Sequence, residues 1–102
     1  MSDSADLVCF DCGLRLPLGH FWNVTEPGER YLFDADGRPS SDSAGLGRAL
    51  WRMLAEHVYH ELRVVGEQSD QLERIDPFTL RTIGGDLKQD PSLAEYLADW
   101  HG

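Results

Sequence analysis

The segment AGLGRALWRMLAEHVYHELRVVG, residues 44–66, decides the predicted fold. Stepping about 100° per residue gathers its apolar side chains on one side of a helix. These are Leu46, Leu50, Met53, Leu54, Val58, Val64 and Val65. Arg48, Arg52, Glu56 and Arg63 gather on the other side. Ser40, Ser41, Asp42 and Ser43 offer N-caps, and Gly66 is a stop signal. We therefore predict one long helix over residues 44–65.

Upstream of this helix, two runs rich in aromatic and β-branched residues predict a β-hairpin. The runs are residues 20–24 and 30–33, and Pro27 followed by Gly28 between them is typical of a reversing turn. The apolar run at residues 7–10 is short and leads into a turn at 11–13. Residues 1–6 are polar and acidic, and we expect them to form a disordered N-terminus.

Downstream, the pattern predicts shorter helical pieces. One covers residues 69–74. Asp76 and Asp90 are each followed by proline. An N-cap residue followed by proline is a typical start of a helix, so these two pairs predict helices over 78–83 and 92–100. The predicted fold class is therefore α+β, with an N-terminal β-hairpin followed by one long helix and two or three shorter helices. Residues 7–102 are expected to form a single globular domain.

The charge of the chain excludes several function classes. Its 102 residues include 18 acidic and 9 basic side chains, for a net charge of −9. Nucleic-acid phosphates and anionic membrane surfaces would repel such a chain, so we expect neither as a partner. No run of apolar residues is long enough to span a bilayer, and the start of the chain does not resemble a signal peptide. We expect a cytoplasmic protein.

Four residues with metal-ligand chemistry stand in two closely spaced pairs. Cys9 and Cys12 form a C-x-x-C followed by Gly13, a spacing with which a tight turn can present two thiolates to one Zn²⁺ ion. His57 and His60 are three residues apart, so on a helix they would share a face. That face is the apolar one, where unpartnered polar groups are costly to bury. The pattern predicts a possible structural zinc site.

Other interpretations of these residues remain open. Cys is a common buried residue, and the histidines could be hydrogen-bonded in the core instead of binding metal. Glu61, also on the apolar face, is an alternative metal ligand, or it could pair with Arg74 or Arg81. Thiol exchange is disfavoured, because a reactive C-x-x-C normally opens a helix, whereas Pro17 and Gly19 would break one here.

Two classes of function fit these features. The first is a small acidic binding or regulatory module, of the inhibitor or immunity type, that acts on a protein partner with a basic surface. Trp51, at the border of the apolar stripe, is a candidate interface residue. The alternative is a small metalloenzyme that uses His57, His60 and Glu61, with water at an open metal position. The sequence places no general base for it.

Overall fold

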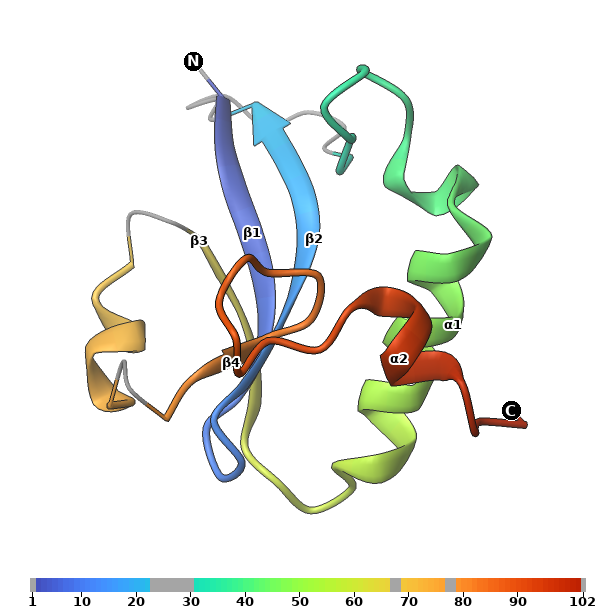
Figure 1. Ribbon diagram of the computed structural model, residues 1–102. Coiled ribbons are helices and arrows are strands. Elements are labelled where there is room, and N and C mark those ends of the chain that lie inside the picture. The colour runs from blue at the N-terminus through green and yellow to red at the C-terminus, as the bar shows by residue number, and fades with distance from the viewer. Residues whose placement is uncertain (1, 23–30, 67–68, 77–78, 102) are drawn as a thin grey trace.

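The computed structural model describes residues 2–22, 31–66, 69–76 and 79–101, and it confirms a mixed α+β architecture (Figure 1). In this part of the chain the sheet has four strands, β1 (Ser2–Cys9), β2 (Leu14–Trp22), β3 (Leu62–Gly66) and β4 (Arg81–Thr82). Their order is β3-β1-β2-β4, with β1 antiparallel to both neighbours and β2 parallel to β4. The helices are α1 (Ala44–Glu56) and α2 (Leu93–Leu97), with 3₁₀ turns η1 (Ser40–Asp42) and η2 (Gln71–Arg74).

Both faces of the central strand β1 are buried. Because successive strand residues point to opposite faces, Leu7 and Cys9 face the larger core and Val8 faces the smaller one. The larger core lies between the sheet and α1, which contributes Ala49 and Met53. The smaller core is closed by the segment around η2 (Figure 1), and its other buried members are Val65 and Ile75. The C-terminal end of β1 is therefore covered from both sides.

Strand β2 contains Pro17 and Gly19, the two residues predicted to break a helix after Cys12. The pairing with β1 shifts its register here, since Ala5 pairs with Gly19 and Asp6 with Pro17. A β-bulge tolerates proline, which has no N–H to donate. Gly19 has φ +127°, and a Cβ there would lie 2.7 Å from the backbone oxygen of Phe33. Both residues thus fit this irregular part of the strand.

The long helix predicted over residues 44–65 is wrong in its second half. Helix α1 ends at Glu56, and residues 62–66 instead form β3, which pairs with β1. The apolar residues of a short strand cannot be told from a helical stripe by spacing alone, and β-branched Val64 and Val65 suit a strand. The predicted N-cap of this helix is confirmed, since Ser43 Oγ accepts a hydrogen bond from the Leu46 N–H at the start of α1.

The N-terminal hairpin also differs from the prediction. It is formed by β1 and β2 around the turn at residues 10–13, and residues 2–6, expected to be disordered, form the first half of β1. These polar residues have little intrinsic strand propensity, and tertiary pairing overrides it. Of the predicted pairing between residues 20–24 and 30–33, the structure contains the antiparallel bridge from His20 to Phe33. The Pro27–Gly28 turn lies outside the described residues.

The C-terminal half contains less helix than predicted. The turn at residues 71–74 is confirmed, but Arg81 and Thr82, expected in a helix, form β4. Helix α2 begins after Ser92, which forms a capping box with Glu95, and not at Asp90. The Asp90 carboxylate instead accepts hydrogen bonds from the Thr82 and Leu87 backbone N–H groups.

No helix in the described residues is long and apolar enough to cross a membrane.

Met53 and Leu54 provide a matched test of the core between α1 and the sheet. Met53 is 0% exposed and its neighbour Leu54 is 40% exposed. Met53→Ala should lower the free energy of unfolding by about 2–4 kcal/mol, because it removes buried volume and leaves a cavity. Leu54→Ala should cost less than about 1 kcal/mol. Urea denaturation of both variants measures the difference, and equal losses would contradict this placement of α1.

Candidate metal centre

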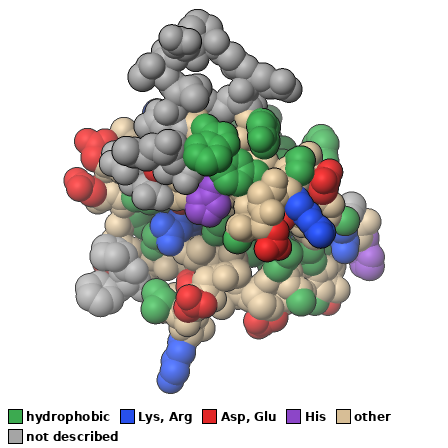
Figure 2. All heavy atoms as spheres, turned by 90° about the horizontal axis from the view of Figure 1, so that it is seen from above, with side chains coloured by type: hydrophobic (Ala, Val, Ile, Leu, Met, Phe, Trp, Pro, Cys, Tyr) green, Lys and Arg blue, Asp and Glu red, His purple; other side chains and the backbone are tan. Residues whose placement is uncertain are grey.

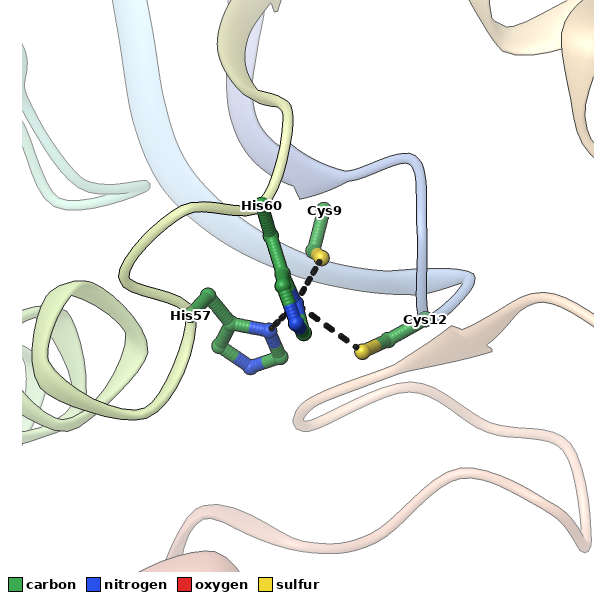
Figure 3. Close-up of side chains that lie close together, drawn as sticks. All are labelled: Cys9, Cys12, His57 and His60. Atoms are coloured by element: carbon green, nitrogen blue, oxygen red, sulfur yellow. Dashed lines mark hydrogen bonds between the residues drawn. The ribbon is translucent and has the colours of Figure 1, made fainter.

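Two turns at one end of the sheet carry the cysteines and the histidines. Cys9 is the last residue of β1, and Cys12 lies in the turn that leads to β2. His57 is the C-cap of α1, and His60 lies in the turn that leads to β3. Figure 3 shows all four side chains pointing toward one another across the space between these turns. The structure thus brings together the residues that the sequence singled out in pairs.

The side chains meet in a compact cluster that could hold a metal ion. One ligand atom from each of the four residues lies within 4.8 Å of the others. His60 Nδ1 is central, 3.5 Å from Cys9 Sγ, 3.4 Å from Cys12 Sγ and 3.2 Å from His57 Nδ1. Cys9 and His57 are buried, whereas Cys12 and His60 are exposed. The cluster therefore has an inner half and a solvent-facing half.

Hydrogen bonds alone account poorly for this geometry. A ring nitrogen of neutral histidine carries either one proton or one lone pair. His60 Nδ1 nevertheless has three partners within hydrogen-bond distance, two of them sulfur atoms and the third another ring nitrogen. At most one of these contacts can be a full hydrogen bond to that nitrogen. A cation placed among the four atoms would interact favourably with a lone pair from each.

The three distances from His60 Nδ1 fit the edges of a zinc tetrahedron that meet at one corner. With Zn–S bonds of about 2.3 Å and Zn–N bonds of about 2.0 Å, tetrahedral angles give S···N edges of about 3.5 Å and an N···N edge of about 3.3 Å. The observed S···N distances are 3.5 and 3.4 Å, and the N···N distance is 3.2 Å. Two thiolates and two imidazoles are also a donor set that zinc prefers.

The surroundings of His57 and Cys12 favour the neutral form of each side chain. Burial lowers the pKa of His57, and the neighbouring His60 lowers it further while Glu56 opposes the shift. Neutral imidazole is the form that donates a lone pair to a metal. Burial also raises the pKa of the Cys12 thiol, helped by its neighbours Cys9 and Asp11. A metal would therefore have to displace a proton from this thiol on binding.

Backbone contacts join the two turns independently of the cluster. The Phe10 N–H donates to the Glu61 carbonyl at 3.0 Å, and the Glu61 N–H donates to Asp11 Oδ2 at 2.6 Å. These bonds keep the two turns together beside the four side chains. No pattern in the sequence marks Asp11 as part of this site, because its contact with Glu61 depends on the pairing of β1 with β3.

Glu61, predicted as an alternative metal ligand, is not a member of the cluster. Its carboxylate oxygens accept hydrogen bonds from Arg74 at 2.6 and 2.9 Å, and Arg63 also donates to it at 2.9 Å. The hydrogen bond from Arg74 is the main reason that the pKa of Glu61 falls to about 2. The Arg74 guanidinium also lies over the Phe10 ring, 4.4 Å from its centroid. The alternative pairing of Glu61 with Arg74 is thus the one observed.

The histidines meet by a different route from the predicted one. They do not lie on one face of a helix, because the His60 N–H closes a turn onto the His57 carbonyl at 2.9 Å. Tyr59 within this turn has φ +73°. The left-handed conformation reverses the chain, so that His60 points back toward His57 (Figure 3). The spacing of three residues suits this turn as well as it suits a helix.

A surface cavity of about 380 Å³ adjoins the cluster at Cys12 and His57. Its walls include Cys12 and His57 together with Arg52, Arg81 and Tyr96. It lies beside helix α2, whose Tyr96 contacts Arg52 of α1 through a cation–π interaction with 4.7 Å between the guanidinium and the ring centroid. Small molecules in solvent can therefore reach the Cys12 side of the cluster.

Comparisons with protein-family models, with curated proteins and with solved structures find no match for this chain.

The turn that positions His60 can be tested at Tyr59, whose side chain is fully exposed at 102%. A left-handed conformation costs a non-glycine residue about 1–2 kcal/mol, which glycine does not pay. Glycine has more conformational freedom in the unfolded chain, however, and its greater entropy loss on folding costs about 0.5–1 kcal/mol. Tyr59→Gly should therefore leave stability unchanged or raise it by up to about 1 kcal/mol. Tyr59→Val should lower it, because β-branched residues avoid this conformation. Thermal unfolding gives the order, and a Tyr59→Gly variant as unstable as Tyr59→Val would refute the turn.

Proposed function

We propose that this chain is a small, non-enzymatic binding module whose fold is stabilised by a structural zinc ion held by Cys9, Cys12, His57 and His60. One observation carries the metal assignment. Four donor atoms from two separate turns lie within 4.8 Å of one another, and the three separations measured from His60 Nδ1 match edges of a zinc tetrahedron.

The number of donors favours a structural role over a catalytic one. A catalytic zinc ion usually has three protein ligands and keeps a fourth position for water. Here four protein donors are available for the four positions, and two of them come from the buried residues Cys9 and His57. The metalloenzyme that we considered needs Glu61, and that carboxylate is bound to Arg74. The geometry therefore supports a closed site that links two turns.

Metal content and metal removal test the site. Protein purified without added metal should contain about one zinc ion per chain by elemental analysis. A strong chelator should then lower the melting temperature, and zinc should restore it, because metal that binds only the folded state adds its binding free energy to stability. Protein free of metal that melts at the same temperature with and without chelator would refute the proposal.

Ligand variants give the matched control for this experiment. His57→Ala and His60→Ala should each weaken zinc affinity by more than about tenfold, since losing even an indirect partner of a metal ligand costs that much. His101→Ala removes an exposed histidine outside the cluster and should leave zinc affinity unchanged. Competition with a chromogenic chelator measures all three affinities. Equal affinities for the three variants would mean that zinc binds elsewhere.

The binding role rests on the charge of the molecule and on exposed aromatic surface. A net charge of −9 favours association with a basic protein surface and opposes association with acidic ones. Acidic and basic side chains are interspersed on the face shown in Figure 2, which favours a broad electrostatic attraction over one acidic docking patch. Trp51 is 67% exposed on α1 and can supply the apolar anchor that charge alone does not give.

Salt dependence tests the binding role. Partners captured by the immobilised protein at low ionic strength should be basic proteins, and raising the salt concentration should release them, because screening weakens charge attraction. Trp51→Ala should weaken capture of the same partner, whereas Leu87→Ala, an exposed apolar residue outside α1, should not. A partner that is acidic, or one whose binding ignores ionic strength, would overturn this part of the proposal.

A further inference from the structure

The two cysteines of the cluster differ sharply in their access to solvent. Cys9 is 0% exposed and packs in the core between the sheet and α1, whereas Cys12 is exposed in the turn that follows. In Figure 3 the sulfur atom of Cys12 lies on the side of the cluster away from the body of β1. A reagent from solvent therefore meets the Cys12 sulfur first.

The cavity of about 380 Å³ beside the cluster leads to this same residue. It is large enough for a small molecule, and Cys12 forms part of its wall together with Arg81 and Arg52. The Cys12 sulfur is also close to a second thiol, because the ligand atoms of the cluster lie within 4.8 Å of one another. An oxidised Cys12 thus has a resolving cysteine within reach of a small movement of the exposed turn.

We propose that Cys12 is an oxidation site for hydroperoxides, and that its reaction forms a disulfide with Cys9 and releases the zinc ion. The inference rests on the proposed zinc site, which keeps both sulfur atoms in the reactive thiolate state. This oxidation differs from the thiol exchange of a redox enzyme. Thiol exchange is disfavoured here because strand β2, and not a helix, follows the C-x-x-C turn. The chain would instead lose its metal when oxidant is present and regain it after reduction.

The chemistry balances in two steps. The Cys12 sulfur attacks one oxygen of the hydroperoxide, the O–O bond breaks, and the departing alkoxide or hydroxide takes a proton to leave as an alcohol or water. The Cys9 sulfur then attacks the sulfenic acid, forms the S–S bond and expels hydroxide, which takes a second proton to become water. Two thiolates lose two electrons, the peroxide gains them, and the zinc ion departs without changing its oxidation state.

Loss of the metal removes one link between the two turns and leaves others. The backbone bonds between Phe10 and Glu61, and the pairing of β1 with β3, do not involve the metal ligands' side chains. His57 and His60 lose their common ion, so the end of α1 is released from the cysteine turn. Oxidation would therefore loosen the α1 side of this end of the molecule while the sheet remains paired.

The experiment treats zinc-loaded protein with hydrogen peroxide and follows released zinc with a chromogenic chelator. One zinc ion per chain should be released, the two thiols that can be titrated after denaturation should disappear, and the mass of the metal-free chain should be two hydrogen atoms below that of the reduced chain. A reductant followed by zinc should restore the original state. Zinc release without a Cys9–Cys12 disulfide, or oxidation to sulfinic acid instead, would overturn the inference.

Cys12→His is the matched variant, because it keeps a four-donor site for zinc and removes the exposed thiol. Its zinc should be released by hydrogen peroxide at least about tenfold more slowly than that of the unsubstituted chain. Equal rates would show that Cys12 is not the oxidation site. In the unsubstituted chain, mild alkylation should label Cys12 before Cys9, a readout that does not depend on how the variant folds, and the reverse order would contradict the proposed access.

The two proposals fail in different ways. If the purified protein holds no zinc and does not bind it, the proposed metal site is wrong. If it holds zinc but hydrogen peroxide leaves that zinc bound, the site stands and the oxidation proposal is wrong.

Discussion

Strand β1 forms ladders with β2 on one side and with β3 on the other, and the arrangement of the candidate site depends on this double pairing. Cys9 is paired with Leu14 across one ladder and with Leu62 across the other. The turns that flank these partners must therefore lie at the same end of the sheet. Residues that are 48 positions apart, Cys12 and His60, are brought to 3.4 Å in this way. The register of the sheet thus acts as the scaffold of the cluster.

This arrangement places four potential metal donors within 4.8 Å of one another at a partly buried position. Buried polar atoms without partners are costly, and the cost grows as water is excluded. Cys9 and His57 are both buried, and His60 Nδ1 faces three acceptor-capable atoms at once. A divalent cation resolves that conflict more completely than any choice of histidine tautomer. The same cation would join the end of α1 to the hairpin, two parts that local sequence contacts do not connect.

The charged residues of the chain divide into those that build the fold and those that remain at the surface. Arg74 joins Glu61 to the Phe10 ring, and Arg52 contacts both Glu56 and the Tyr96 ring. Several arginines thus act as packing groups in addition to balancing charge. The remaining acidic excess is distributed, which suits a partner that is attracted over a broad surface. Oxidation at Cys12 would instead act locally, on the metal cluster that joins the two turns.

The sequence by itself determined the mixed class of the fold, helix α1 and the identity of the four candidate donor residues. Those follow from local chemistry, since helical periodicity, capping serines and closely spaced Cys and His pairs are visible without any partner. Only the tertiary structure decided that residues 62–66 are a strand, that polar residues 2–6 begin the hairpin, and that Glu61 belongs to Arg74. Short apolar runs fit a helix or a strand equally well, and the choice is made by pairing with β1. The convergence of the two turns likewise depends on a sheet register that no local pattern encodes.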